Sequence, residues 1–184
     1  MTDNNIKRYL FEQYEQLALS IKNRKIRKIV FEQSYIAGGA IASLVLNEIP
    51  NDLDIYFYDK EQCKKVIAYF RKYHNDRCLK FSDNALLVYP NIHFIFKFYG
   101  KPRNTIRRFD FLHCRAFYEP NTDKLFIAQY AMHYIRNKKL MYIQEFKIDH
   151  YNVYRLMKFL EKGWTIKRSS LKKLFKYLTA HTRP

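Results

Sequence analysis

The hydrophobic positions of the first hundred residues recur at two different spacings. Residues 3–22 carry apolar side chains three or four positions apart, which is the period of an amphipathic helix. In residues 92–98 every second side chain is apolar, and Ile95 is the one apolar residue among those between them. This alternation predicts a strand with one buried face. The same patterns and the turn residues between them predict further strands over 35–37, 52–58, 85–89 and 109–118, and helices over 40–47, 60–73 and 105–108.

Beyond residue 120 the pattern becomes helical. It predicts helices over 125–137, 151–162 and 170–180, with Gly163 ending the second of them. The 184 residues suit one domain with a small appendage. The fold class expected is therefore α/β (α+β), with a mixed sheet flanked by helices over residues 1–120. A basic helical region over 121–184 is expected to pack on that core.

Composition and charge indicate the kind of partner. Hydrophobic residues make up 48% of the chain, enough for a packed core. Lysine and arginine number 34 against 17 acidic residues, a formal net charge of +17. Phosphate backbones are the commonest partners of such a surface. An anionic membrane is the alternative, but the chain has no lipidation motif and no isolated basic amphipathic tail, so nucleic acid is favoured.

The cysteines and the hydropathy indicate the compartment. Cys63, Cys78 and Cys114 are odd in number and lack close spacing, which favours reduced thiols. The first ten residues lack the apolar core of a signal peptide, and the longest nearly apolar run, 36–46, is shorter than a membrane helix. We therefore expect a soluble intracellular, cytoplasmic protein with no membrane partner. An organelle matrix or a virus-infected cell remains possible.

The stretch YIAGGAIASLVLNEIPNDLDIYF, residues 35–57, carries the candidate chemistry. Along a strand, residues two apart point to the same side, so Asp52 and Asp54 would project together. Adjacent carboxylates repel each other unless a cation lies between them, and Mg²⁺ or Mn²⁺ would relieve that repulsion. The alternative is a pair of solvated aspartates in a loop before a strand.

The glycine pair in the same stretch adds a second component. Gly38 and Gly39 lie between a predicted strand and a predicted helix, and the chain has only 4 glycines. Backbone N–H groups at such a turn, together with the following helix N-terminus, can bind phosphate. A phosphate cradle joined by one short helix to an Asp-x-Asp pair describes a site for a nucleoside triphosphate and its metal.

These motifs resemble the nucleotidyltransferase superfamily, whose members include DNA polymerase β and the CCA-adding enzymes. Gly38, Gly39, Asp52 and Asp54 match its signature in order and context, and Ala40 stands where many members carry serine or another small residue. The matching region covers residues 35–58, and the family's core would extend to about residue 118. The resemblance implies a mixed sheet flanked by helices and a third carboxylate on a later strand.

The third carboxylate is assigned to Asp110, in RRFDFLHCRAFYEP, because it opens a predicted strand after a basic segment. Asp59 and Asp83 are alternatives, but both lie in predicted turns or caps. Asp110 could also be a purely structural aspartate at the head of its strand. The segment around it is also similar, more loosely, to short nucleotidyltransferase-like proteins encoded by phages.

The resemblance also implies a mechanism. Asp52, Asp54 and Asp110 would be the catalytic residues and would hold two metal ions, with Asp110 as general base. The acceptor hydroxyl would attack the α-phosphorus in line, and pyrophosphate would leave from the cradle formed by Gly38, Gly39 and Ala40. Most of the catalysis would be positioning and charge neutralisation.

Basic side chains supply candidate nucleic-acid contacts. They precede Asp110 or lie in the C-terminal region: Lys101, Arg103, Arg107, Arg108, Lys158, Lys162, Lys167, Arg168, Lys172 and Lys173. Basic residues interleaved with aromatic ones suit backbone contact and base stacking. The alternative is a set of solvated helix faces, and most of the nearby aromatic residues are expected to join the core.

The function expected is a metal-dependent nucleotidyl transfer from a nucleoside triphosphate to an acceptor hydroxyl, on RNA in preference to DNA. A second hypothesis keeps the fold without the activity, as an RNA-binding structural subunit of a ribonucleoprotein such as a ribosome. A third is a toxin that nucleotidylates a small molecule or a protein. The six histidines form no close pair and give no metal or hydrolase motif.

Overall fold

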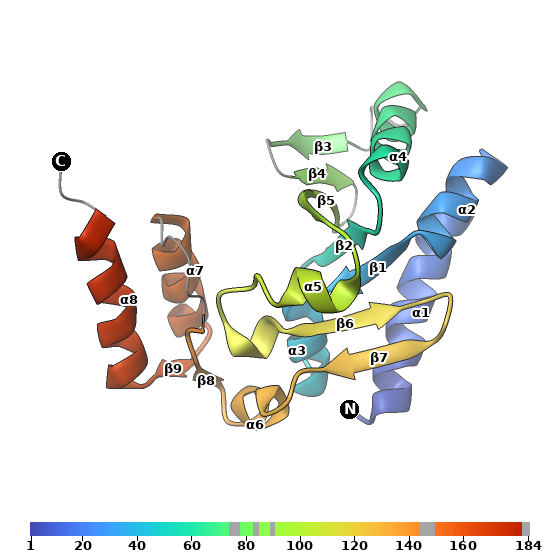
Figure 1. Ribbon diagram of the computed structural model, residues 1–184. Helices are drawn as coiled ribbons and strands as arrows, with labels where there is room; N and C mark the ends of the chain where they lie inside the picture. The colour runs from blue at the N-terminus through green and yellow to red at the C-terminus, as the bar shows by residue number, and fades with distance from the viewer. Residues whose placement is uncertain (74–77, 83–84, 89–90, 144–149, 182–184) are drawn as a thin grey trace.

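A seven-stranded sheet forms the centre of the computed structural model, which describes residues 1–73, 78–82, 85–88, 91–143 and 150–181. The strand order is β3-β4-β5-β2-β1-β6-β7 (Figure 1). The strands are β1 (Ser34–Ala37), β2 (Leu53–Phe57), β3 (Cys78–Phe81), β4 (Ala85–Val88), β5 (Ile92–Tyr99), β6 (Ala116–Glu119) and β7 (Lys124–Ile127). Neighbours pair antiparallel except β2 and β5, which are parallel. The expected mixed sheet flanked by helices is confirmed.

Helices surround this sheet and continue beyond it. They are α1 (Asp3–Ser20), α2 (Arg24–Glu32), α3 (Gly39–Val45), α4 (Lys60–Tyr73), α5 (Pro102–Ile106), α6 (Ala131–Arg136), α7 (His150–Glu161) and α8 (Arg168–His181), with a 3₁₀ turn, η2, over Leu112–Cys114. A two-stranded parallel sheet joins β8 (Lys139–Leu140) to β9 (Thr165–Ile166). Within the described parts of the chain, no helix is both long and apolar enough to cross a membrane.

One face of the sheet packs on α1, α2 and α4. The α1 helix begins at Asp3 because the Thr2 hydroxyl accepts a hydrogen bond from the Asn5 N–H, a typical N-cap. Its predicted apolar stripe is buried. On the same side of the sheet, the ring of Phe94 contacts Phe57 of β2 and Phe70 of α4. This face forms the main hydrophobic core.

The opposite face carries tyrosines and is covered by α5. Tyr35 of β1 stacks on Tyr56 of β2, with ring centroids 5.8 Å apart, and the Tyr35 hydroxyl donates to Thr105 of α5. Because residues two apart share a face of a strand, Asp54 emerges on the same side as Tyr56. The Asp-x-Asp pair therefore opens on the tyrosine face, away from the main core.

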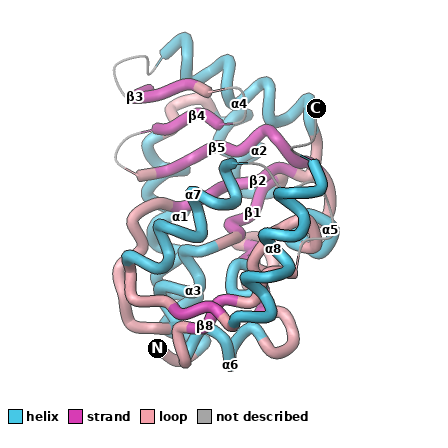
Figure 2. Tube along the Cα trace, turned by 90° about the vertical axis from the view of Figure 1, so that its left-hand side faces the viewer, coloured by secondary structure: helices cyan, strands magenta, loops and turns pink. Residues whose placement is uncertain are grey.

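The C-terminal helices pack beside this second face. His113 of η2 contacts Phe159 of α7 and Trp164, which follows it, with ring centroids 4.5 and 4.3 Å apart. Seen from the side of the C-terminal helices, α7 lies in front of β2 and β5 (Figure 2). This packing is what brings basic residues of α7 near the carboxylate pair.

The structure corrects several predicted elements. The strand expected over 109–118 is a 3₁₀ turn followed by β6, which begins at Ala116. The helix expected over 125–137 is β7 followed by α6, so a strand beyond residue 120 pairs with β6 and completes the sheet. The helix α2 and the strand β3 were not predicted. The end of the strand expected over 85–89 lies outside the described residues.

Candidate active site

The two aspartates of the Asp-x-Asp motif lie at the start of β2. Their side chains are 44% and 33% exposed for Asp52 and Asp54, whereas Leu53 and Ile55 between and after them are buried. This alternation fits a strand with its apolar side chains in the main core. Both carboxylates therefore project from the tyrosine face and remain accessible to solvent and ligands.

A histidine that the sequence did not single out joins the two aspartates. His93 is paired in register with Asp54 on the parallel neighbour β5. Its Nδ1 lies 3.1 Å from Asp54 Oδ1 and 4.0 Å from Asp52 Oδ2. The hydrogen bond to Asp54 raises the pKa of His93 above its ordinary value, although burial and the nearby Lys158 oppose this. The alternation of β5 could indicate the face of His93, but only the parallel pairing places it here.

Gly38 lies directly against the carboxylate pair. Its φ of +110° is strained for any residue with a side chain. A Cβ at this position would lie 3.6 Å from Asp54 Oδ2 and 4.0 Å from the ring of Phe109. The Gly38 N–H donates to the Ala116 carbonyl oxygen, at 3.1 Å. Gly38 thus supplies the turn and the space, and its own N–H is already engaged. Of the three residues predicted to meet phosphate, Gly38, Gly39 and Ala40, the last two lie at the start of α3.

The two glycines differ in what an alanine would do. We expect Gly38→Ala to lower the free energy of unfolding by about 1–3 kcal/mol, because only glycine adopts its backbone conformation without strain. Gly39→Ala is the matched control, since it has no neighbour within 4 Å of its Cβ position and begins a helix. Urea denaturation followed by circular dichroism measures both. Equal losses in the two variants would contradict this account.

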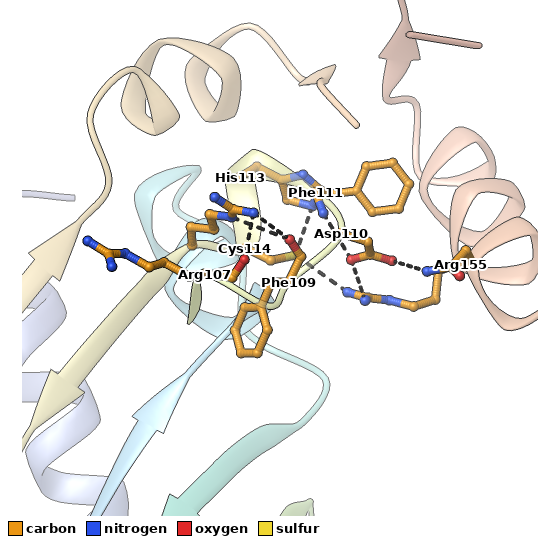
Figure 3. A network of polar contacts seen from close by, with 9 residues as sticks. Arg107, Phe109, Asp110, Phe111, His113, Cys114 and Arg155 are labelled. Carbon is orange, nitrogen blue, oxygen red and sulfur yellow. Dashed lines mark hydrogen bonds and ion pairs between the residues drawn. The ribbon is translucent and has the colours of Figure 1, made fainter. Parts of the chain in front are cut away.

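Asp110 is buried and held by several partners, as Figure 3 shows. Its Oδ1 accepts from the Phe111 N–H at 2.9 Å and from the Arg155 guanidinium at 2.6 Å. Its Oδ2 accepts from the Asn152 side chain at 3.1 Å. These contacts join the segment before η2 to α7. They favour a role in positioning Arg155, and the metal and general-base roles of Asp110 stay untested predictions.

The carboxylates do not gather into the expected cluster of three. Over the described ranges, no group of three or more His, Cys, Asp or Glu side chains is arranged as a ready metal site. Of the two alternatives to Asp110, Asp59 caps α4 by accepting from the amides of Glu61 and Gln62. Asp83 lies outside the described residues. Asp52 and Asp54 are therefore the carboxylates that the structure brings together.

Arg155 also reaches a buried pair in η2, His113 and Cys114. Cys114 Sγ is 3.3 Å from His113 Nε2, and a guanidinium nitrogen of Arg155 is 3.6 Å from the sulfur. Burial raises the pKa of the Cys114 thiol to about 12 and lowers the pKa of His113 to about 3. Cys63 and Cys114 are both free thiols. The pair therefore stays uncharged at neutral pH and acts as part of the core.

The buried His113 predicts a pH dependence of stability. Its folded pKa is below the unfolded value of about 6.5, so the unfolded chain takes up a proton that the folded chain does not. The contribution of His113 to the free energy of unfolding is fully present above about pH 6.5. Below that pH it falls by about 1.4 kcal/mol per pH unit. Between pH 7 and pH 5, the free energy of unfolding of His113→Phe should fall by about 2 kcal/mol less than that of the natural chain. Urea denaturation at the two pH values measures this difference. Equal losses of unfolding free energy in the two proteins would contradict the view that His113 is buried in its uncharged form.

The family model described as "Gabija anti-defense 2 family protein" matches residues 4–138. The chain belongs to the Gabija anti-defense 2 family. A protein named "Gabija anti-defense 2" from Bacillus phage SPbetaL7 is 26% identical over 167 residues, covering 87% of this chain and 40% of that protein. This chain thus spans less than half the length of that relative. The relative comes from a phage, which agrees with the similarity to phage proteins expected from the sequence.

Solved structures of tRNA nucleotidyltransferases share the fold of this family member. The Thermotoga maritima CCA-adding enzyme complexed with tRNA has a TM-score of 0.61 and 14% identity, over 91% of this chain and 45% of that one. A tRNA-processing enzyme in an apo form has a TM-score of 0.60 and 16% identity, over 92% and 48%. The Bacillus stearothermophilus CCA-adding enzyme with CTP has a TM-score of 0.55 and 16% identity, over 74% and 37%. The expected nucleotidyltransferase-like fold is confirmed.

The basic residues predicted to contact nucleic acid are exposed where their side chains are described, and they lie on different elements of the fold. Lys158 of α7 is close enough to lower the pKa of His93, so α7 presents positive charge to the carboxylate pair. Arg103 of α5 lies over the Phe126 ring at 4.3 Å, and Arg108 lies over the Phe98 ring at 5.4 Å. The other predicted residues with described side chains are also exposed: Lys101, Arg107, Lys162, Lys167, Arg168 and Lys172. The Lys173 side chain lies outside the described residues.

Proposed function

We propose that this chain transfers a nucleotide from a nucleoside triphosphate to an acceptor hydroxyl. One observation carries the proposal: the Gly38 turn lies against Asp54, with 3.6 Å between the glycine's Cβ position and Asp54 Oδ2. A side-chain-free turn, a helix start and two accessible carboxylates therefore share one place on the tyrosine face. The nucleotidyltransferase-like fold supports the same assignment.

The donor set fits a divalent cation with a preference for oxygen, Mg²⁺ or Mn²⁺. Asp52 and Asp54 lie on the same side of β2, are partly exposed and lie next to a glycine that leaves space beside Asp54. They are the residues that would hold such an ion. When bound, it would neutralise the repulsion between the carboxylates and the charge of the triphosphate.

The chain's own groups would do the positioning. The amides that begin α3, at Gly39 and Ala40, would orient the leaving phosphates, and Lys158 would add positive charge from α7. His93 fixes the orientation of Asp54 through its hydrogen bond. Asp110 would hold Arg155 at the edge of the site, in addition to the metal role predicted for it.

The acceptor we propose is RNA. The net charge of +17 and the exposed basic side chains of α5, α7 and α8 favour a polyanionic acceptor. Among the solved structures that share the fold, one is complexed with tRNA and another with CTP. The hypothesis of a structural ribonucleoprotein subunit stays a prediction without a comparison that supports it.

The family suggests where such a transfer would act. We propose that this chain opposes the Gabija defence in a phage-infected host cell, as the name of its relative indicates for that protein. In that setting the nucleotidylating-toxin hypothesis predicts that the acceptor is a protein of the host defence. The acceptor class is therefore the first property to measure.

The test is to incubate the protein with each α-labelled nucleoside triphosphate, Mg²⁺ or Mn²⁺, and host lysate. We expect label in a discrete RNA that ribonuclease removes, and no label with the Asp52→Asn variant. Label that survives ribonuclease and is removed by protease would show that the acceptor is a protein and not RNA. No label under any of these conditions would contradict the proposed transfer.

A further inference from the structure

A pocket of about 470 Å³ lies where α6, the short orange helix at the bottom of Figure 1, packs on η2 and β8. Leu112, Met141 and Ile143 supply its apolar lining, and Arg115 and Gln129 supply polar groups. None of these residues belongs to the candidate active site. The volume falls within the range of about 300–1,000 Å³ that is typical of sites for small molecules.

The backbone holds the walls of this pocket in place. The Leu112 N–H donates to the Met141 carbonyl oxygen at 3.0 Å, and the Ala128 N–H donates to the Arg115 carbonyl oxygen at 2.9 Å. The Arg115 guanidinium donates to the Arg107 carbonyl oxygen at 2.8 Å, which fixes a positive charge beside the pocket. Because these segments are already ordered, a ligand would bind without the free-energy cost of ordering them.

Local structure does not explain why residue 130, which also lines the pocket, is a tyrosine. Its φ of +64° lies in the left-handed region, which favours glycine or asparagine over a bulky side chain. Tyr130 is the N-cap of α6, where serine, aspartate and asparagine are preferred, and among the described residues its side chain makes no capping hydrogen bond. The residue is 69% exposed, so it contributes little to the core. A strained and exposed aromatic residue beside a pocket indicates a contact with a ligand.

The aromatic lining suits a nucleobase. His133 and Tyr134 of α6 line the pocket together with Tyr130. Bases stack on such rings with little dependence on sequence, because every base has a π-face. The Gln129 amide adds a hydrogen-bond donor and an acceptor for the edge of a base.

The charge near the pocket suits the phosphates on either side of that base. Residues 129–143 include no aspartate or glutamate, and their basic residues are Arg136, Lys138 and Lys139. Lys138 forms an ion pair with Glu48 at 2.7 Å, so Arg136 and Lys139 supply the net positive charge of this segment. Arg115 adds a further guanidinium from the segment after η2. Positive charge of this kind favours a nucleic-acid backbone.

We propose that this pocket receives an unpaired base of single-stranded RNA, which stacks on the Tyr130 ring while the adjoining phosphates contact the basic residues nearby. This inference rests on the part of the proposed function that makes RNA the acceptor, and not on the transfer itself. A single-stranded region is required because the faces of a base inside a duplex are covered by its neighbours. The pocket would hold the acceptor at a point separate from the reacting hydroxyl.

The test measures the affinity of the full chain for a fluorescent single-stranded RNA and for the same RNA as a duplex, without nucleotide or divalent cation. We expect Tyr130→Asn to weaken single-strand binding about tenfold and to leave duplex binding unchanged. The same variant should unfold in urea at the natural concentration or above it, because asparagine suits both the N-cap and the left-handed backbone. Tyr130→Phe keeps the ring and should bind like the natural chain. Tyr73→Asn, at a 60% exposed position of α4, is the matched control and should also bind like the natural chain.

Two results would overturn this role of Tyr130. One is natural affinity of Tyr130→Asn for the single strand, and the other is an equal loss for single strand and duplex, which would indicate phosphate contact without stacking. A loss confined to single-stranded DNA of the same sequence would overturn RNA as the ligand. Because no triphosphate is present, the transfer is judged separately. Nucleotide transfer with no effect of Tyr130→Asn on binding would contradict the pocket alone, and the reverse result would contradict the transfer alone.

Discussion

Replacing Asp54 with asparagine should reduce nucleotide transfer by about a thousandfold or more while leaving the fold intact. The side chain is partly exposed and lies outside the main core, so its loss removes little packing. The substitution also relieves repulsion between Asp52 and Asp54. The transfer would lose a group that holds charge at the reacting phosphate, where single preorganised contacts are worth factors of about 10²–10³.

The initial rate of incorporation of an α-labelled nucleotide measures this effect, and urea denaturation measures the stability of the same samples. Glu61→Gln is the matched control, because it removes one acidic charge from an exposed position of α4. We expect that variant to transfer nucleotide at the natural rate. An Asp54→Asn variant that keeps the natural rate would overturn the assignment of the site.

Replacing Arg155 with methionine should lower the free energy of unfolding by about 3–5 kcal/mol, the largest loss of stability that we expect. Asp110 is only 2% exposed, and Arg155 lies 2.6 Å from its Oδ1. Without the guanidinium, folding would bury a carboxylate that lacks its countercharge. The contact also joins α7 to the segment before η2, so its loss weakens the attachment of the C-terminal helices.

A double-mutant cycle separates the charge pair from the packing of the side chains. Asp110→Asn removes the buried charge, so the double variant Arg155→Met/Asp110→Asn should be more stable than Arg155→Met alone. Arg168→Met, at an exposed position of α8, is the control and should change stability by less than about 0.5 kcal/mol. A loss below about 1 kcal/mol for Arg155→Met would contradict the structural role of this pair.

Local patterns predicted the parts of the fold that depend on neighbours in the sequence. The stripe of α1, the alternation of β5 and the turn at Gly38 each follow from residues within one element. The glycine pair and the Asp-x-Asp motif likewise predicted one site, because a single short helix joins them. These features needed no knowledge of how distant strands pair.

The remaining features depend on contacts between distant segments. His93 lies 39 residues from Asp54, and only the parallel pairing of β2 with β5 brings the two together. Asp110 was expected to open a strand, but the chain turns into η2 there, and Asn152 and Arg155 engage its oxygens from α7. The edge strand β7 was expected to be helical, because its apolar residues do not alternate and its pairing with β6 decides its structure.

Following two labels on one nucleoside triphosphate tests the proposed nucleotide transfer. The protein is incubated with host RNA, a divalent cation and the triphosphate labelled on either its α- or its γ-phosphorus. We expect the α-label to enter the acceptor and the γ-label to appear in pyrophosphate in equal amount. With the Asp54→Asn variant we expect neither labelled product. Transfer of the γ-label to an acceptor, or no reaction by folded protein that binds the nucleotide, would contradict the proposed transfer.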